Sequence, residues 1–428
     1  MTKTEKNFDV LVVGGGPSGM MAAISAAQQG ARVALIDKNK KVGKKLLMTG
    51  GGRCNVTNAR SVDEILSNVP GNGRFLYSAF SQFSNLDIID FFERNGVPLK
   101  EEDHGRMFPV TNKSKTIVDA LFNKLLSLHV SYFPNQAVTD LLLEDGKVQG
   151  VVTDQETFHA PSVVLSTGGR AYPSTGSTGD GYRLARTAGH TISPLYATES
   201  ALLSDDSFIQ NKSLQGISLR EVQLSVLNAK GKTVIAHQHD LLFTHFGLSG
   251  PAALRCSSFI NQLLSKGQAS VTVHLDQFPD QSLAQLTDKL TKLSATDKSV
   301  KNALAPLTQE RMLLFLLAFN KIESNLPAKS LSPQQLQHLA ESFKAFPINI
   351  QHTFPIEKSF VTGGGVTLKE INPKTLESKK TAGLFMTGEL LDINGYTGGY
   401  NITCAFVTGY VAGLHATDQI SELIGLSV

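Results

Sequence analysis

The sequence predicts an α/β protein in which a discontinuous nucleotide-binding domain is interrupted by an inserted region. Three observations support this fold class. A βαβ pattern opens the chain, glycine is concentrated in three distant stretches, and the 170 residues from 191 to 360 contain only five glycines. Of the 37 glycines, 25 lie in residues 1–60, 161–190 and 361–413. Because glycine lets the backbone approach a ligand closely, these stretches predict one glycine-lined site built from separate parts of the chain.

The first βαβ unit lies within residues 8–37. Residues 8–13 (FDVLVV) form an apolar run of strand length, GGGPSG follows, and MMAAISAAQQG predicts a helix of small residues that ends near Gly30. A second strand is predicted over residues 32–36 (RVALI), and Asp37 follows it directly. This order of strand, glycine-rich turn, helix and strand is typical of a nucleotide-binding fold.

Two further elements are predicted before residue 190. Asp145 and Gly146 stand between two apolar runs, and this pair favours a turn with positive φ, so a hairpin is expected over residues 137–154. Residues 163–167 (VVLST) predict a buried strand that leads into a pair of glycines.

The glycine-poor region predicts an insertion with two parts. Residues 200–275 show the alternation of β structure, and residues 281–345 show the helical spacing of Leu, Gln, Lys and Ala. Glycine-rich, strand-like sequence returns at 360–400, and a small-residue helix is predicted over 400–414. The expected boundaries are residues 1–194 and 356–428 for the nucleotide-binding domain, 195–278 for an inserted β-rich domain and 279–355 for an inserted helical domain.

Composition and charge exclude several classes of protein. Forty basic against 37 acidic residues leave a net charge of +3, and the hydrophobic fraction of 41% excludes a disordered chain. This mild charge without a basic–aromatic stripe predicts no nucleic-acid partner. The three cysteines form no CxxC pair, so neither a disulfide framework nor a metal site is expected.

The ends and apolar runs of the chain predict its location. The N-terminus has no apolar region of the secretory type. The longest apolar run, LLFLLAF at 313–319, is far shorter than the roughly 20 residues that span a bilayer. We therefore expect a cytoplasmic protein with no membrane partner and a small-molecule substrate. The oligomeric state is left open.

The turn after the first strand carries the fingerprint Gly14-x-Gly16-x-x-Gly19, with Pro17 and Ser18 inside it. Gly14 permits the tight turn, Gly16 lets the backbone approach a pyrophosphate, and Gly19 allows close packing of helix and strand. The N-terminus of the helix offers N–H groups and the positive end of its dipole to phosphates. The sequence therefore predicts a dinucleotide at this turn.

Asp37 is placed to accept hydrogen bonds from a ribose diol. It leads into the loop 38–58 (KNKKVGKKLLMTGGGRCNVTN) rather than into the compact second βαβ half that NAD binding favours. A flexible loop rich in hydrogen-bond donors suits a ligand that extends well past the pyrophosphate, as an isoalloxazine does. Neither residues 176–181 nor 362–367 supply a second GxGxxG. One permanently bound FAD is therefore the expected cofactor, and NAD(P)H is the expected transient reductant.

Four blocks of sequence resemble the BaiN-like bacterial flavoproteins. They are residues 44–58 (KKLLMTGGGRCNVTN), 166–190 (STGGRAYPSTGSTGDGYRLARTAGH), 241–254 (LLFTHFGLSGPAAL) and 387–413 (TGELLDINGYTGGYNITCAFVTGYVAG). The family is labelled both as NAD(P)/FAD-dependent reductases and as aminoacetone-oxidase-type enzymes. The resemblance implies a two-dinucleotide-binding, Rossmann-like FAD domain that is discontinuous, with inserted β-barrel-like and helical domains. The family often has Glu at the position of Asp37, a longer carboxylate with the same role.

The resemblance also implies which residues contact the cofactor. It places Asp37 at the adenosine ribose and the backbone of Val138 at the adenine. Gly388, Glu389 and Asp392 would meet the ribityl chain. The N-terminus of the last helix would stabilise negative charge at N1–C2=O of the reduced flavin. The full expected set comprises Gly14, Gly16, Pro17, Ser18, Gly19, Asp37, Lys38, Lys45, Leu46, Gly52, Arg53, Cys54, Asn55, Val138, Thr167, Gly168, Gly169, Gly388, Glu389, Asp392, Gly399, Tyr400, Asn401 and Ile402.

Catalytic candidates are His245, Arg53 and Tyr172. His245 is a candidate proton donor because His transfers protons near neutral pH, and its alternative is a hydrogen-bonded turn residue. Tyr172 and Tyr400 are alternative donors. Arg53 would stabilise the reduced flavin or bind a substrate carboxylate, or it forms a structural ion pair. Cys54 has no nearby second cysteine, which favours a packing role over a redox one.

These residues predict an FAD-dependent oxidoreductase. In the favoured hypothesis NAD(P)H reduces the flavin, and hydride passes from N5 to a small organic acceptor such as an enone. The alternative enzyme is an oxidase that takes hydride from an amine or hydroxy substrate and reduces oxygen. An RNA-modifying flavoprotein and a non-catalytic flavin sensor are less favoured alternatives.

Overall fold

The chain divides into two compact units. In this computed structural model, which describes residues 5–418, unit 1 comprises Met1–Tyr196 and Phe360–Val428, and unit 2 comprises Ala197–Ser359. Unit 1 is therefore discontinuous in sequence, and unit 2 is a single insertion. Each unit has its own sheets and its own helices.

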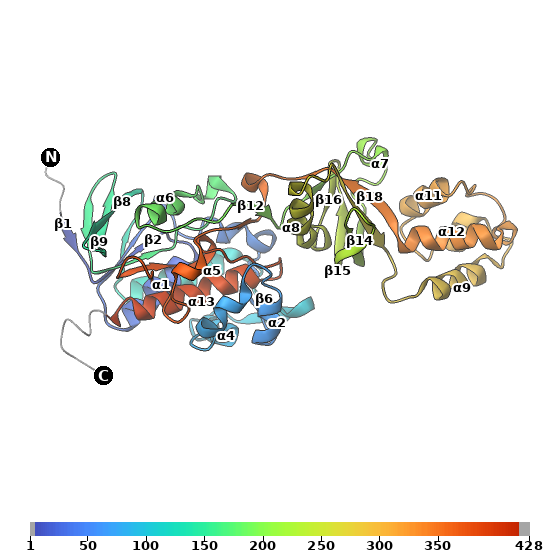
Figure 1. The fold of residues 1–428 in the computed structure, drawn as a ribbon. Helices are drawn as coiled ribbons and strands as arrows, with labels where there is room; N and C mark the ends of the chain where they lie inside the picture. The colour runs from blue at the N-terminus through green and yellow to red at the C-terminus, as the bar shows by residue number, and fades with distance from the viewer. Residues whose placement is uncertain (1–4, 419–428) are drawn as a thin grey trace. The chain divides into compact units, whose positions relative to one another are not determined.

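A five-stranded parallel sheet is the centre of unit 1 (Figure 1). Its strands are short and apolar. Every residue of Val10–Val13 and of Val33–Ile36 is buried, as is typical of a parallel sheet covered on both faces. Leu11 pairs with Val163 on one side and with Ala34 on the other. In spatial order the strands are β21 (Leu384–Met386), β11 (Ser162–Leu165), β2 (Val10–Val13), β3 (Val33–Ile36) and β7 (Ser131–Phe133).

Helices α1 and α13 pack against each other beside this sheet (Figure 1). Their contact is close because Gly409 and Gly413 face the backbone of Ser18 and Ala22, where any Cβ would clash. The first and last parts of the chain are therefore joined in one layer. The helices of unit 1 are α1 (Pro17–Gln28), α2 (Val62–Ser67), α3 (Tyr77–Phe80), α4 (Asn85–Arg94), α5 (Ser114–Ser127), α6 (Asp180–Thr187) and α13 (Tyr400–His415).

Two smaller sheets complete unit 1. The hairpin of β8 and β9 turns at Asp145 and Gly146, which have φ values of 47° and 75°. One sheet has the order β1 (Glu5–Asn7), β10 (Thr157–His159), β9 (Lys147–Thr153) and β8 (Val138–Glu144). The other has the order β4 (Thr57–Asn58), β6 (Arg106–Pro109) and β5 (Leu99–Glu102). The short strands β12 (Tyr196–Thr198) and β20 (Val361–Gly363) lie where the chain leaves and re-enters unit 1.

Unit 2 contains a seven-stranded sheet that closes on itself. Strands β18 and β19 lie at opposite ends of the strand order, yet only Gln351 separates them in sequence. One stretch of chain therefore pairs with β17 and with β13, and the sheet curves back on itself like a small barrel. The order is β18 (Phe346–Ile350), β17 (Val271–Asp276), β14 (Ser218–Leu227), β15 (Thr233–Phe243), β16 (Gly247–Ser249), β13 (Leu202–Leu203) and β19 (His352–Thr353).

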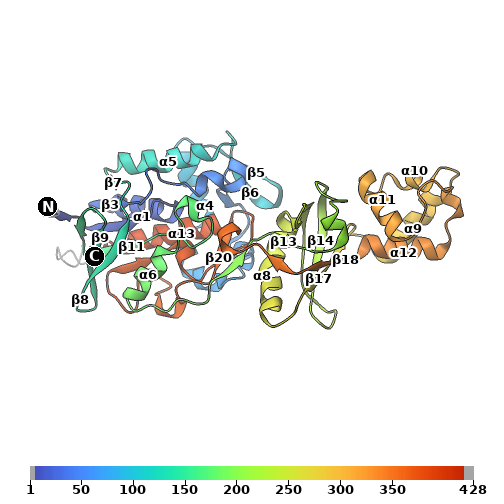
Figure 2. The ribbon, with the colours of Figure 1, turned by 90° about the horizontal axis from the view of Figure 1, so that it is seen from above.

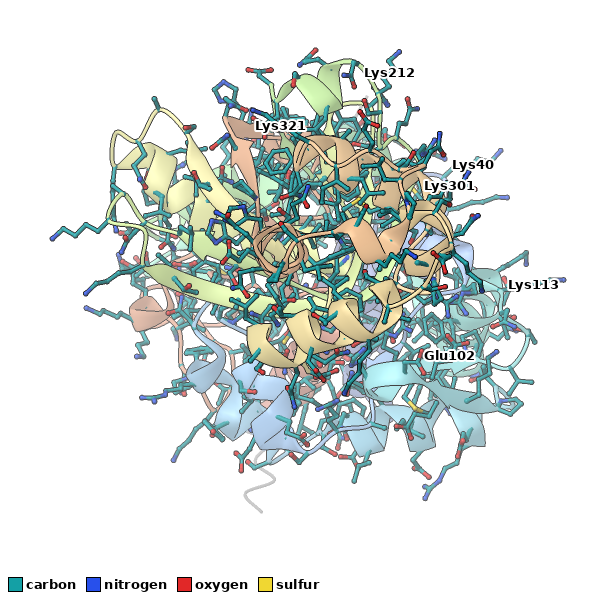
Figure 3. The ribbon with its side chains drawn as sticks, turned by 90° about the vertical axis from the view of Figure 1, so that its right-hand side faces the viewer. Lys40, Glu102, Lys113, Lys212, Lys301 and Lys321 are labelled. Atoms are coloured by element: carbon teal, nitrogen blue, oxygen red, sulfur yellow. The ribbon has the colours of Figure 1, made fainter. Side chains whose placement is uncertain are left out.

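Helices accompany this sheet in unit 2 (Figure 2). Capping boxes begin two of them: Ser282 and Ser332 each accept from a backbone N–H three residues on. Lys212 and Lys321 are exposed residues of the unit (Figure 3). The helices are α7 (Ser207–Gln210), α8 (Pro251–Ser265), α9 (Leu283–Ser294), α10 (Val300–Leu304), α11 (Glu310–Phe319) and α12 (Pro333–Lys344).

The helices of unit 2 end at Lys344, in agreement with the helical spacing predicted over residues 281–345, but the expected helical domain of residues 279–355 also contains two strands. Residues 346–353 were included in the helical region, but they form β18 and β19, in which Phe346, Ile348 and Ile350 alternate inward. A five-residue alternation after a helix is too short a signal to show which distant strands it pairs with. Among the residues described, no helix combines the length and apolarity needed to cross a membrane.

Candidate functional site

The turn between β2 and α1 is tightly enclosed at two glycines and open at a third. A Cβ on Gly14 would lie 2.5 Å from the carbonyl oxygen of Ser166, and one on Gly19 would clash with the carbonyl of Gly14. At Gly16 nothing lies within 4 Å of the Cβ position. Pro17 is the first residue of α1, and no side chain caps the helix at Gly16. The turn therefore leaves room for an anionic group at the N-terminus of the helix.

Asp37 binds the same turn from the end of β3. Its Oδ2 accepts a hydrogen bond from the backbone N–H of Gly15 at 2.6 Å, and its Oδ1 accepts one from that of Asn39 at 2.6 Å. Each carboxylate oxygen keeps a further lone pair for a hydroxyl donor. The next residue, Lys38, pairs with Asp180, so a protein carboxylate holds this ammonium group.

The loop after β3 turns sharply at three consecutive glycines. Gly50, Gly51 and Gly52 have φ values of 57°, 65° and 84°, and Gly51 and Gly52 have nothing within 4 Å of a Cβ. Leu46 anchors the start of the loop in the core, with 2% of its side chain exposed. Such open backbone in left-handed conformation is a surface that a planar ligand can approach closely.

Three predicted residues follow these glycines and have different surroundings. Arg53 donates to both carboxylate oxygens of Glu102 at 2.9 and 3.0 Å and lies over the ring of Phe108. This is the structural ion pair that the sequence left open as an alternative role for Arg53. Cys54 is fully buried with φ of 60°, and burial raises the pKa of its thiol to about 12. The Oδ1 of Asn55 is buried without a hydrogen-bond partner among the described residues.

Glu389 joins three segments of unit 1. Its Oε2 lies 2.8 Å from the Nζ of Lys45, and its Oε1 accepts from the backbone N–H of Thr362 at 2.8 Å. A Cβ on Gly169 would lie 2.8 Å from that same Oε1. Thr362, in turn, accepts at its hydroxyl from the N–H groups of residues 170 and 171. No local sequence pattern indicates Thr362, because two of its partners lie more than 190 residues earlier and Glu389 lies 27 residues later.

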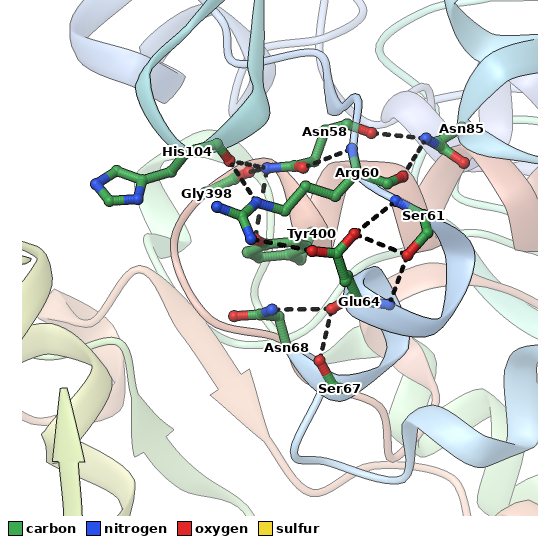
Figure 4. A network of polar contacts seen from close by, with 10 residues as sticks. All are labelled: Asn58, Arg60, Ser61, Glu64, Ser67, Asn68, Asn85, His104, Gly398 and Tyr400. Atoms are coloured by element: carbon green, nitrogen blue, oxygen red, sulfur yellow. Dashed lines mark hydrogen bonds and ion pairs between the residues drawn. The ribbon is translucent and has the colours of Figure 1, made fainter. Parts of the chain in front are cut away.

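Asn58 is a second residue that connects distant segments (Figure 4). Its fully buried amide donates to the carbonyl of His104 at 2.9 Å and to that of Gly398 at 3.1 Å. Its backbone carbonyl accepts from the side chain of Asn85 at 2.8 Å. Asn58 thereby fixes the turn that begins α13. The only available signal was its position at the end of the block GGGRCNVTN.

The N-terminus of α13 is built from predicted residues. Gly399 caps the helix with φ of 94°, and a Cβ there would lie 2.8 Å from the carbonyl of Thr57. Asn401 exchanges two hydrogen bonds with the backbone of Gly395, at 2.8 and 2.7 Å. Tyr400 is buried, and Ile402 is half-buried. No side chain makes a capping hydrogen bond at this helix N-terminus.

The remaining predicted contacts lie at strand ends. Gly388, with φ of 62°, donates to the hydroxyl of Thr408 at 2.9 Å, and Asp392 accepts from Ser193 at 2.9 Å. The Oγ1 of Thr167 is buried and has no partner in the part of the chain that is described. Val138 is half-buried at the start of β8, and Gly168 has φ of 71°.

The three glycine-rich stretches meet in unit 1. Gly14 contacts Ser166 across the first and second stretches, Gly388 contacts Ser18 across the third and first, and Gly169 contacts Glu389 across the second and third. Of the catalytic candidates, Arg53 and Tyr172 lie in unit 1. His245 lies in unit 2, is exposed, and packs its ring 5.0 Å from that of Phe246. The catalytic role of each remains a prediction.

The residues of this site fit a bound dinucleotide. Open space at the Cβ positions of Gly16, Gly51 and Gly52 provides a cradle that larger residues would fill. The unpartnered oxygens of Asn55 and Thr167 are buried groups that a ligand can satisfy. With the parallel sheet and the two uncapped helix N-termini, they define a dinucleotide-binding protein of the Rossmann-like class.

The chain belongs to the HI0933-like family, whose Rossmann domain matches residues 8–415. This membership confirms the resemblance inferred from the sequence blocks. The 3-dehydro-bile acid delta(4,6)-reductase of Clostridium scindens is 30% identical over 416 residues, which cover 95% of this chain and 98% of the relative. The ribosomal RNA dihydrouridine synthase of Escherichia coli is 30% identical over 414 residues, covering 95% and 97%.

Solved structures share the fold at low sequence identity. The 3-ketosteroid delta1-dehydrogenase of Sterolibacterium denitrificans gives a TM-score of 0.53 at 14% identity, covering 97% of this chain and 100% of that one. The 3-ketosteroid-delta4-(5alpha)-dehydrogenase of Rhodococcus jostii RHA1 gives 0.51 at 15% identity, covering 97% and 98%. These likenesses cover nearly the whole chain and show a shared fold.

Proposed function

We propose that this protein is an FAD-dependent reductase of carbon–carbon double bonds conjugated to a carbonyl group, with NAD(P)H as the reductant. The observation that carries the proposal is the pair of relatives aligned over 95% of the chain. One is named for reducing delta(4,6) double bonds of a 3-dehydro-bile acid, in which the alkenes are conjugated to the 3-keto group. The other is named for making dihydrouridine, the product of adding hydrogen across the C5=C6 bond of uridine, which is conjugated to the C4 carbonyl.

The net reaction balances with these reactants. NAD(P)H gives a hydride, the medium gives a proton, and the products are NAD(P)⁺ and the saturated carbonyl compound. When bound, FAD supplies the two-electron chemistry that links donor and acceptor. The acceptor takes hydride at the carbon β to the carbonyl and a proton at the α carbon. Tyr172 and His245 are the proposed sources of that proton.

The chain's own residues would bind and orient the cofactor. The open turn at Gly16 and the N-terminus of α1 suit the pyrophosphate, and Asp37 suits the ribose. Glu389 and Lys45 hold the glycine-rich loop against β20. The N-terminus of α13, fixed by Asn58, presents the positive end of a helix dipole to developing negative charge.

Anaerobic rapid mixing tests the proposal. The purified protein is expected to be yellow, and NADPH or NADH should bleach the flavin before any acceptor is added. A conjugated enone should then restore the oxidised spectrum, whereas its saturated analogue should not. If neither nicotinamide bleaches the flavin, the reductase proposal is wrong. Bleaching by an amine or hydroxy substrate, with reoxidation by oxygen alone, supports the oxidase instead.

A uridine of ribosomal RNA is the second candidate acceptor. Two relatives with this activity in their names, from E. coli and Haemophilus influenzae, align with 95% and 96% of the chain at 30% and 28% identity. The chemistry is the same conjugated reduction. The test is the dihydrouridine content of ribosomal RNA, measured by mass spectrometry after incubation with enzyme and NADPH. The Gly16→Leu variant is the matched control, because it should lack the cofactor.

A further inference from the structure

Tyr172 and Phe360 form an aromatic pair on unit 1. Burial in the core does not account for this pair, because one of the two rings is largely exposed. Their ring centroids are 5.8 Å apart and their planes are inclined by 35°. Phe360 keeps 52% of its surface exposed. A large apolar ring that remains in water gains little from folding, and exposed aromatic groups of this kind often mark a binding site.

The backbone of Tyr172 adopts a conformation that bulky residues avoid. Its φ and ψ are 54° and 63°, in the left-handed region. The surrounding chain enforces this conformation, because the carbonyl of Tyr172 accepts from both the N–H and the hydroxyl of Thr175, at 2.9 and 2.7 Å. Strain of this kind is concentrated at functional sites, where it aims a side chain. The Tyr172 hydroxyl makes no hydrogen bond to any other residue within the range described.

The pair is attached to the frame that holds the candidate cofactor site. Residues 170 and 171, which precede Tyr172, donate their N–H groups to Thr362, two residues after Phe360. The N–H of Thr362 binds Glu389, and Glu389 pairs with Lys45. Both rings therefore leave the backbone within a few residues of the groups expected to hold the ribityl chain.

We propose that Tyr172 and Phe360 bind a planar, conjugated ring of the acceptor by stacking, with the Tyr172 hydroxyl donating to its carbonyl oxygen. The inference rests on the proposed reductase function and names its substrate class as cyclic and unsaturated. Aromatic faces attract flat π-systems and discriminate little between flexible aliphatic chains. An acyclic enone would gain much less from this surface.

The absence of tryptophan from the sequence allows a direct binding test. Phe360→Trp introduces one fluorophore into the oxidised holoenzyme, and menadione, a planar conjugated dione, is the probe. Emission should fall with a saturable dependence on menadione. Tyr77→Trp is the matched control, because Tyr77 is 50% exposed on the same unit. Its emission should fall only because menadione absorbs light. This effect does not saturate and is the same for both variants.

Steady-state kinetics provides the second readout. Phe360→Leu should raise the KM for menadione about tenfold, the size expected for a lost stacking contact. The KM for pent-3-en-2-one, an acyclic enone, and the rate of flavin reduction by NADPH should stay within about twofold. Tyr172→Asn should also raise the KM for menadione and, because it removes the proposed proton source, should lower kcat with both acceptors. Asn tolerates the left-handed conformation and keeps the loop folded.

The two proposals fail in different ways. Equal quenching of both tryptophan variants, together with an unchanged KM for menadione, overturns the aromatic pair while turnover continues. A flavin that neither nicotinamide reduces overturns the reductase function. Saturable quenching of Phe360→Trp would then still support the binding of planar rings.

Discussion

The ammonium nitrogen of Lys45 lies 2.8 Å from a carboxylate oxygen of Glu389, although 344 residues separate them in sequence. The other oxygen of Glu389 accepts from the backbone N–H of Thr362. One carboxylate therefore connects the first glycine-rich loop to the two segments that follow the insertion. Both side chains are largely shielded, with 25% and 20% of their surface exposed.

Glu389→Gln should loosen this connection. The amide keeps an acceptor for Thr362 but loses the charge that holds Lys45, so the free energy of unfolding should fall by about 1–2 kcal/mol. FAD should also be lost more readily on gel filtration. Glu102→Gln is the matched control, because it removes the partner of Arg53 at a less enclosed ion pair. Unchanged denaturant midpoints for Glu389→Gln would contradict the connecting role.

Gly16 and Gly19 should respond to substitution in opposite ways. Gly16 has φ of −79° and open space around its Cβ position, so Gly16→Leu should fold, purify without colour and melt close to the Tm of FAD-free wild type. Gly19→Ala would clash with the carbonyl of Gly14, and the forced shift should cost about 1–3 kcal/mol of stability. Absorbance near the flavin bands and thermal melts check both. A yellow Gly16→Leu protein would mean that the pyrophosphate does not bind at this turn.

Cys54 should be unreactive in the folded protein. All three cysteines are buried, and burial raises the pKa of Cys54 and of Cys404 to about 12, so little thiolate exists at pH 8. Iodoacetamide at that pH should label none of the three in the native state and all three after unfolding, as mass spectrometry would show. Cys54→Ala should keep turnover within about twofold. Loss of turnover with intact flavin content would instead support a redox thiol.

Glu370 should make stability depend on pH. Burial raises its pKa, but hydrogen bonds from Lys380 and Thr191 outweigh that effect and lower the pKa to about 2. A carboxyl group whose pKa is lower in the folded state stabilises the protein above its ordinary pKa of about 4.3. That contribution disappears as the pH falls through the folded value.

The comparison of wild type with Glu370→Gln measures this contribution. The variant should be less stable by roughly 2 kcal/mol at pH 7, and the difference should shrink steadily between pH 5 and pH 3. Urea unfolding at several pH values checks it. Glu101→Gln, at an exposed position, should show no such trend. A difference that stays constant over this range would rule out a charge effect.

The local sequence predicted the parts of the site that depend on local backbone geometry. Gly14 and Gly19 lie in crowded positions and Gly16 in an open one, which is the backbone geometry that the sequence predicted for this turn. The binding of a pyrophosphate at Gly16 stays a prediction. The position of Asp37 could be predicted because it directly follows β3, and β3 lies beside β2, the strand that leads into the glycine-rich turn. The clustering of glycine also showed that three distant stretches meet.

Partners separated by long stretches of chain could not be predicted in this way. Nothing near Thr362 indicates that Glu389 and residues 170–171 bind it, and nothing near Asn58 indicates Gly398. The strands at 346–353 were missed because their pairing depends on β13 and β17, which lie far earlier in the chain. The left-handed backbone of Cys54 and Tyr172 has no sequence signal, since both side chains disfavour it.

The contacts of Gly388 with Ser18 and of Lys45 with Glu389 also bear on synthesis in the cell. During translation the first glycine-rich turn emerges early, but the segments that complete its site appear only after the whole of unit 2 has been made. A nascent chain that stops before residue 400 has no α13 to enclose a cofactor. Capture of FAD must therefore follow release of almost the entire chain, and unit 2 has time to close its own sheet first.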